Sequence, residues 1–211
     1  MDFDKNVFVN CPFDDEYMPL LRPILFVILD LGMTPKIALE SLDSGSARIE
    51  KIVKLIQESK YAIHDLSRLK AKKRGELHRL NMPFELGMDV GCRRFGEGRA
   101  AEKRCLILEA ERYRYQAALS DMSGSDIAVH GNDPVEAAVQ VRNWLRSEAR
   151  LRAPGPSLVW GRFTDFMAAT YVKLVDAGHS DEDVRRLPIP ELLEEMQGWI
   201  AAFPVGVASR R

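Results

Sequence analysis

Two carboxylates four residues apart give the clearest chemical signal in this sequence. Glu85 and Asp89 lie in the apolar segment of residues 81–91, and a spacing of four places both side chains on one face of a helix. A carboxylate beside an apolar stripe is partly desolvated, and desolvation raises its basicity. Such a group can act as a nucleophile or stabilise a positive charge that develops on a bound substrate.

Polar side chains also stand where the predicted strands end. Residues 7–9 and 61–66 are short β-rich runs, and Asn10 follows the first while Asp65 lies at the end of the second. In a parallel sheet, ligands bind beyond the carboxyl ends of the strands, near the point where the strand order reverses. The side chains expected at that edge are Asn10, Pro12, Asp65 and Glu85.

A candidate phosphate site lies at the start of the helix predicted over residues 47–59. Ser44, Ser46 and Arg48 stand there, where backbone N–H groups and a guanidinium can hold a phosphate. Ordinary N-capping beside a surface arginine explains the same three residues. The basic stretch of residues 70–74 likewise fits either a phosphate contact or a solvated loop.

Three further features near these residues have both a structural and a functional interpretation. His64 is either a proton carrier beside Asp65 or a strand histidine with satisfied hydrogen bonds. A catalytic role for Cys11 is disfavoured, because the sequence shows no suitable histidine partner. Gly87 and Gly91 admit either the close approach of a ligand or packing of the helix onto the sheet.

The order of the predicted elements indicates an α/β fold. The expected strands are residues 7–9, 34–39, 61–66, 104–108 and 127–129, and the expected helices are residues 14–31, 47–59, 82–94 and 134–150. Alternating strands and helices predict a parallel sheet of about five strands with helices on both faces.

A Pro- and Gly-containing linker at residues 153–156 divides the chain into two predicted parts. Residues 1–152 form the α/β domain, and residues 157–211 form a helical C-terminal subdomain with amphipathic helices over 160–177 and 189–200. Those helices are also a candidate surface for a protein partner. Their aromatic side chains, expected in the core or at an interface, are Trp160, Phe163, Phe166 and Tyr171.

The overall composition excludes several classes of function. A formal net charge of -1 provides no global basic field, so binding to nucleic acid is not expected. The N-terminus lacks the pattern of a signal peptide, and the apolar run of residues 20–31 is too interrupted and short to span a bilayer. Cys11, Cys92 and Cys105 show no metal-ligand spacing and are odd in number, which favours a reducing cytoplasm and no bound metal.

Three segments resemble the superfamily that joins nucleoside 2-deoxyribosyltransferases with TIR-type NAD-cleaving domains. They are residues 7–13, residues 61–66 and residues 81–87, the last of which contains Glu-Leu-Gly. The resemblance covers residues 7–130 and implies a flavodoxin-like fold.

The resemblance also implies roles for individual residues. Glu85 would attack or stabilise the anomeric carbon of a ribosyl group, and Asp65 would be the acid at the strand end. The turn formed by Asn10, Pro12 and Phe13 would help to enclose the base or sugar. Further residues expected to bind the ligand are Asn81, Met82 and Asp89.

The resulting prediction is an enzyme that cleaves or exchanges the N-glycosidic bond of NAD or of a nucleoside or nucleotide. The resemblance further implies an effector of bacterial antiviral defence and a homo-oligomer whose site is completed between protomers. The nucleotide would be substrate rather than cofactor, and no other cofactor is expected. The alternative is a catalytically inactive module that senses a nucleotide, or acts as a scaffold, through a partner.

Overall fold

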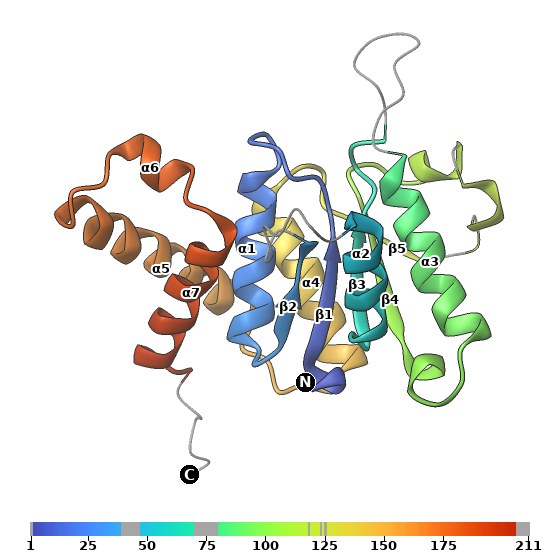
Figure 1. The fold of residues 1–211 in the computed structure, drawn as a ribbon. Helices are drawn as coiled ribbons and strands as arrows, with labels where there is room; N and C mark the ends of the chain where they lie inside the picture. The colour runs from blue at the N-terminus through green and yellow to red at the C-terminus, as the bar shows by residue number, and fades with distance from the viewer. Residues whose placement is uncertain are drawn as a thin grey trace, which may run out of the picture.

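Five parallel strands form the centre of this computed structural model (Figure 1). The structure describes residues 2–38, 47–69, 80–117, 119–122, 124 and 126–205. The strands are β1 (Asn6–Asn10), β2 (Thr34–Lys36), β3 (Tyr61–Asp65), β4 (Arg104–Glu109) and β5 (Ile127–Val129). Their order, β2-β1-β3-β4-β5, is that of a flavodoxin-like sheet, so the predicted fold class is confirmed.

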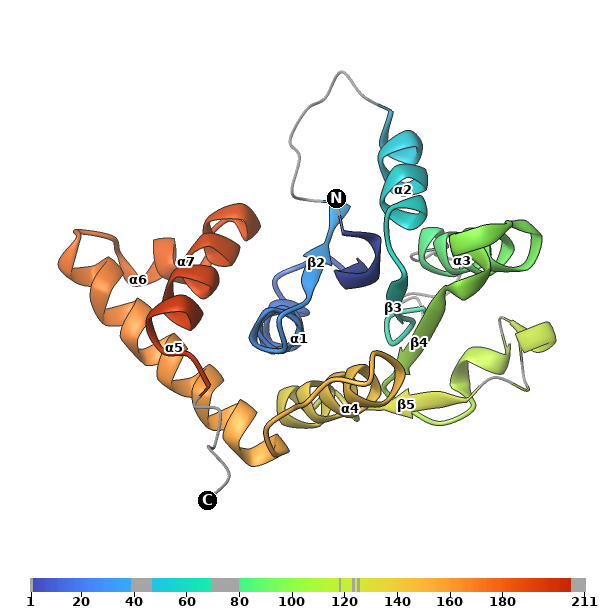
Figure 2. The same ribbon diagram turned by 90° about the horizontal axis from the view of Figure 1, so that it is seen from below.

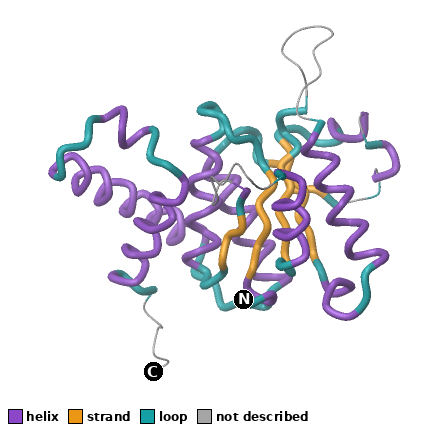
Figure 3. Tube along the Cα trace, viewed as in Figure 1, coloured by secondary structure: helices purple, strands orange, loops and turns teal. Residues whose placement is uncertain are grey.

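Helices cover both faces of the sheet (Figures 2 and 3). α1 (Met18–Asp30) and α4 (Pro134–Glu148) pack together on one face, and α2 (Arg48–Gln57) and α3 (Asn81–Phe95) pack together on the other. Short 3-10 turns complete this part of the chain: η1 (Phe3–Lys5), η3 (Gly98–Glu102), η4 (Arg114–Ala117) and η5 (Ser120–Met122).

β1 and β3 form the middle of the sheet because their side chains suit burial on two sides. Every residue of both strands is buried, as expected for parallel strands that helices cover on each face. Val7 and Val9 join the core beneath α1 and α4, whereas Phe8 packs with Ile52 and Ile56 of α2. The alternation of side chains along a strand therefore decides which helix layer each residue meets.

Two predicted elements differ from the observed ones in their bounds. α1 begins at Met18 rather than at residue 14, because Asp14 accepts hydrogen bonds from Tyr17 and Met18 in a turn before the helix. The strand predicted over residues 34–39 pairs with β1 only over Thr34–Lys36. Its last residue, Leu39, lies outside the described residues.

The buried face of α3 corrects one expectation. The spacing of four predicts Phe84, Met88 and Cys92 on one apolar face with the carboxylates at its margin, but Phe84 is 59% exposed. Glu85 and Asp89 are themselves buried, on the same helix as buried Leu86. The spacing of apolar residues in the sequence does not predict the buried face of α3 correctly, because this helix buries charged side chains against polar partners.

The C-terminal helices pack against α1. They are α5 (Pro156–Asp176), α6 (Asp181–Arg185) and α7 (Ile189–Ala202). Phe26 of α1 stacks on Phe166 at a ring-centroid distance of 5.4 Å and contacts Phe163 and Trp199 at 5.6 and 5.8 Å. These residues belong to one continuous hydrophobic cluster with the α1 face of the sheet, so the helical segment shares the core of the α/β part.

Arg142 of α4 donates hydrogen bonds to the carbonyls of Ala153 and Pro154, which holds the linker against the α/β part. Tyr171 is exposed and donates to Asp181, so it is not a core residue. Within the described ranges, no helix combines the length and the apolar character that crossing a bilayer requires.

Candidate functional site

The candidate site lies where the strand order reverses, between the carboxyl ends of β1 and β3. β1 is flanked by β2 on one side and by β3 on the other, so the connections leave this point in opposite directions. In open α/β sheets, ligands bind at such a point, beyond the carboxyl ends of the strands. The residues gathered there from β1, β3 and the first turns of α3 are Asn10, His64, Met82, Glu85 and Asp89.

Asn10 organises this cluster from the end of β1. Its side-chain Nδ2 lies 3.0 Å from the Met82 carbonyl oxygen and 3.0 Å from His64 Nδ1. A carbonyl oxygen only accepts, so the amide nitrogen must face Met82, and its second proton is donated to His64. The Oδ1 atom of Asn10 is buried and has no hydrogen-bond partner among the described residues.

The same bonds determine the protonation of His64. Because Nδ1 accepts from Asn10, the ring proton lies on Nε2, which faces Asp89 Oδ2 at 3.3 Å. His64 therefore has a partner on each ring nitrogen. This agrees with the structural interpretation made from the sequence and gives His64 a positioning role.

Asp89 is held on both of its oxygens. Oδ2 faces His64, and Oδ1 forms an ion pair of 2.9 Å with the buried ammonium of Lys103. Lys103 also donates to the carbonyls of Ile56 and Ser59 at the end of α2. Burial favours a higher pKa for Asp89, but hydrogen bonding from His64 and the nearby Lys103 outweigh it and lower the pKa.

The pKa of Glu85, one turn earlier on α3, shifts in the opposite direction. The Glu85 side chain is buried, at 5% exposure for the residue, and among the described residues it accepts one long hydrogen bond, of 3.4 Å from Asn81 Nδ2. Burial raises the pKa of Glu85, and Asn81, Arg48 and His64 offset this only in part. A desolvated carboxylate with few partners is the more basic and more reactive of the pair.

Part of the predicted phosphate site lies beside Glu85. Arg48, an exposed residue at the start of α2, is close enough for its positive charge to oppose the rise in the pKa of Glu85. Ser44 and Ser46 lie outside the described residues, as do the basic residues 70–74. Phosphate binding at either segment stays a prediction.

Asp65 belongs to a different cluster from Glu85. It accepts hydrogen bonds from the Tyr17 hydroxyl and from the Ser67 backbone N–H, and His130 Nε2 lies 3.2 Å from its Oδ2. Successive strand residues point to opposite faces of a sheet, so Asp65 is directed away from the layer that His64 meets. The resemblance implies that Asp65 is the strand-end acid of the Glu85 site. Among the described residues, however, the contacts of Asp65 are with Tyr17, Ser67 and His130 and not with Glu85.

The charge of Asp65 is stabilised within its own cluster. Burial favours a higher pKa, but the contacts with His130, Ser67 and Tyr17 outweigh it and lower the pKa. The N–H of Asn132 donates to His130 Nδ1, so the ring proton again lies on the nitrogen that faces the carboxylate. Burial and the Asp65 charge raise the pKa of Tyr17 and keep its hydroxyl protonated.

A further ion pair braces the loops beyond β4. Glu109 at the end of β4 accepts from the Ala110 N–H at 2.7 Å and from Arg114. Arg114 also donates to the Ser67 carbonyl, which links the loop after β3 to the loop after β4. Burial raises the pKa of Glu109 despite these partners. This group fixes the loops that surround the site.

Sequence reasoning missed four members of these networks. Glu109 and His130 directly follow the predicted strands over residues 104–108 and 127–129, so the strand-end rule that selected Asp65 also applies to them. Tyr17 and Lys103 lie outside any predicted strand, and no local pattern indicates that they are buried.

The other predicted ligand residues are distributed between core and surface. Pro12 is buried, Phe13 is half-buried and packs against the main core, and Met82 lies in the core cluster beneath α3. Asn81 is exposed at the first turn of α3. A Cβ atom added at Gly87 would meet no described atom within 4 Å, so packing among these residues does not require this glycine.

Within the described ranges, no three histidine, cysteine, aspartate or glutamate side chains are grouped so that they would hold a metal ion.

Comparison of the chain with protein-family models, with curated proteins and with solved structures finds no match.

Proposed function

We propose that this protein cleaves or exchanges the N-glycosidic bond of NAD or of a nucleoside or nucleotide, with Glu85 acting at the anomeric carbon. The observation that carries the proposal is the desolvated, sparsely bonded carboxylate of Glu85 at the switch point of the sheet. The resemblance of residues 7–13, 61–66 and 81–87 to the deoxyribosyltransferase and TIR superfamily supports the same chemistry.

The reaction needs a carboxylate in such an environment. When the bond from the anomeric carbon to the base nitrogen breaks, its electron pair leaves with the base and positive charge develops on the sugar ring. A carboxylate in contact with that carbon stabilises the charge or captures it as a glycosyl ester. Water then attacks the anomeric carbon and releases the sugar portion of the substrate, or a second base attacks the same carbon and forms an exchanged product. Burial makes Glu85 a stronger nucleophile than a solvated glutamate, provided that it is ionised.

Neighbouring residues are suited to hold the substrate. The unpartnered Oδ1 of Asn10 can accept a hydrogen bond from a sugar hydroxyl, and Asn81 can keep Glu85 oriented through its amide. Arg48 supplies a positive charge for a phosphate of the substrate. His64 and Asp89 act indirectly, because their hydrogen bonds fix the side chain of Asn10.

The test is release of free base by purified protein incubated with NAD, inosine, deoxyinosine and thymidine, each with and without adenine as acceptor. Chromatography separates base, sugar and exchanged nucleoside. We expect release or exchange with at least one of these substrates, and loss of about 99% or more of it in Glu85→Gln, since nucleophile and charge are both removed. Glu97→Gln, which changes an exposed glutamate just after α3, is the matched control.

A nucleotide-binding module without turnover is the second candidate, and the unpartnered acceptor on Asn10 favours it equally. In that case Glu85 would accept a hydrogen bond from a ribose hydroxyl. Calorimetric binding of NAD or a nucleoside, together with no Glu85-dependent release of base from any of the four substrates, would decide for this module and against the enzyme.

A further inference from the structure

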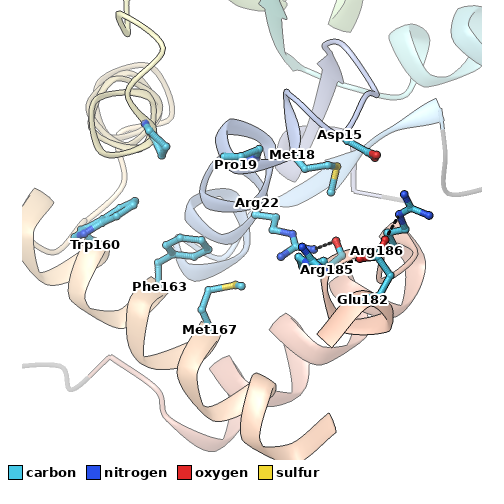
Figure 4. A pocket seen from close by; sticks show the side chains of 11 residues that line it. Asp15, Met18, Pro19, Arg22, Trp160, Phe163, Met167, Glu182, Arg185 and Arg186 are labelled. Atoms are coloured by element: carbon cyan, nitrogen blue, oxygen red, sulfur yellow. Dashed lines mark hydrogen bonds and ion pairs between the residues drawn. The ribbon is translucent and has the colours of Figure 1, made fainter. Parts of the chain in front are cut away.

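A pocket lies between α1, α5 and α6 (Figure 4), on the face of the sheet opposite to the one that carries Glu85. It encloses about 540 Å³, within the range of sites that take small molecules. Figure 4 shows α1 side chains on one wall and α5 side chains on the other. The apolar residues of these walls are Met18, Pro19, Trp160, Phe163 and Met167.

Arg22 of α1 lines this pocket and has an incomplete set of partners. Its Nη2 donates to the last carbonyls of α6, at 3.2 Å to Val184 and 2.6 Å to Arg185. Its Nε is buried and has no acceptor, and no carboxylate pairs with Arg22 in the part of the chain that the structure describes. Burial lowers the pKa of this guanidinium. Arg22 is therefore a partly buried cation with no carboxylate partner among the described residues.

Arg162, a neighbouring arginine, has the kind of carboxylate partner that Arg22 lacks in the described part of the chain. Arg162, on α5, is also mostly buried, but two of its nitrogens, Nε and Nη2, donate to Asp30 at distances of 2.7 to 3.1 Å. The fold thus supplies a bidentate carboxylate to one arginine of this region and not to the other. An arginine that lines a pocket and has no carboxylate partner among the described residues is suited to an external carboxylate or phosphate.

The charges at the rim favour the same ligand. Glu182 of α6 is neutralised by two arginines, with Arg185 Nη2 at 2.6 Å and Arg186 Nε at 2.8 Å. Asp15, exposed at the α1 end of the pocket, is the other acid of the lining. The lining thus carries three arginines against two acids, and Glu182 does not reach Arg22.

We propose that this pocket binds a small molecule with one acidic group on a flat apolar body. The acidic group would accept hydrogen bonds from Arg22, and the flat body would lie against Trp160 and Phe163, whose rings are 5.3 Å apart between centroids. No residue of α3 lines the pocket, so this site is separate from Glu85 and independent of the proposed reaction.

Binding of 2-naphthoate, with its neutral analogue 2-naphthamide and with phenyl phosphate, tests the proposal. Calorimetry gives the affinities, and two-dimensional ¹⁵N–¹H NMR of the full chain locates the site. We expect saturable binding with shifts concentrated at residues 18–22 and 160–167. We also expect naphthoate or phenyl phosphate to bind at least about tenfold more tightly than naphthamide, because a charge-assisted bond to arginine is lost in the amide. The stronger of the two anions identifies the acidic group.

Three variants make the result specific. Arg22→Gln should remove the preference for the anion, and Met167→Trp should fill the pocket and abolish binding while leaving Arg22 in place. Arg146→Gln, which removes a positive charge from an exposed position of α4 outside the pocket lining, should change nothing. If Arg22→Gln does not fold, the proposal is tested by whether Met167→Trp abolishes binding. Equal binding of acid and amide, binding unchanged in Met167→Trp, shifts elsewhere on the protein, or no saturable binding would each overturn the proposal.

Discussion

Glu85 and Asp89 lie one turn apart on α3, both buried, and their pKa values shift in opposite directions. Asp89 has His64 and Lys103 as partners, whereas Glu85 accepts one long hydrogen bond, from Asn81, within the described part of the chain. The helix thus carries one carboxylate that is held by an ion pair and one whose pKa is raised by burial. A pair whose environments separate their pKa values in this way is characteristic of acid and base assignments in active sites.

The first prediction concerns the buried ion pair. Asp89→Asn leaves the ammonium of Lys103 buried without its anion, so we expect the free energy of unfolding to fall by about 3 kcal/mol or more. Urea denaturation at pH 7 measures the loss. Adding Lys103→Met to Asp89→Asn should recover part of it, because the unpaired charge is then removed. A double variant as unstable as the sum of the two single variants would show that the residues are not coupled.

The second prediction concerns the stability of the Glu85 variant. A folded-state pKa raised above the unfolded value means that ionising Glu85 costs stability as the pH rises through these two values. Glu85→Gln removes that cost, so its thermal midpoint at pH 7 should equal or exceed that of the original protein. Differential scanning calorimetry beside Asp89→Asn, which should lose stability, checks this. A clear loss of stability in Glu85→Gln would mean that the carboxylate is structural.

The third prediction concerns acid unfolding and the Asp65 cluster. The lowered folded-state pKa of Asp65 contributes stability that is present above the unfolded pKa of about 3.9 and is lost as the pH falls through the folded value. Tyr17→Phe removes one of the hydrogen bonds that lower this pKa.

The expected result is an acid-unfolding midpoint at higher pH in Tyr17→Phe, with a loss at pH 7 of about 1–3 kcal/mol for the buried acceptor left without its donor. Circular dichroism against pH measures the midpoint. Tyr171→Phe, which removes an exposed hydroxyl bonded to Asp181, is the control and should leave the midpoint in place. An equal shift in both variants would contradict the argument.

The fourth prediction concerns the C-terminal helices. Phe166 stacks on Phe26 of α1 inside the shared core, so Phe166→Ala should lower the free energy of unfolding by about 3–5 kcal/mol. Because the core is continuous, the variant should still unfold in one transition by both tryptophan fluorescence and far-ultraviolet circular dichroism. Two separate transitions would show that residues 157–211 unfold as an independent domain.

The fold could be predicted from the sequence because its strands differ clearly from its helices. Val7-Phe8-Val9 and Tyr61-Ala62-Ile63 are short runs without helical period, and their burial on both faces explains why they are almost wholly apolar. The start of the helix predicted over residues 14–31 could not be predicted correctly, because turn hydrogen bonds to Asp14 delay the start of α1 to Met18.

The site could be predicted only in part, because sequence spacing does not show which partner a polar side chain meets. The four-residue spacing correctly placed Glu85 and Asp89 together, yet it did not distinguish the paired carboxylate from the sparsely bonded one. That difference depends on Lys103, which is distant in sequence and carries no local sign of burial. Likewise, Asp65 and His64 are adjacent in the chain but face opposite helix layers.

The pH dependence of base release from the substrate that is turned over tests the central claim most directly. If Glu85 acts as an ionised carboxylate, the rate should rise with pH through a pKa above the ordinary glutamate value of about 4.3. In Glu85→Gln, the rate should fall by about 99% or more and lose this dependence. Release of base by Glu85→Gln at an undiminished rate, with the same pH profile, would contradict the assignment of Glu85 as the reacting group.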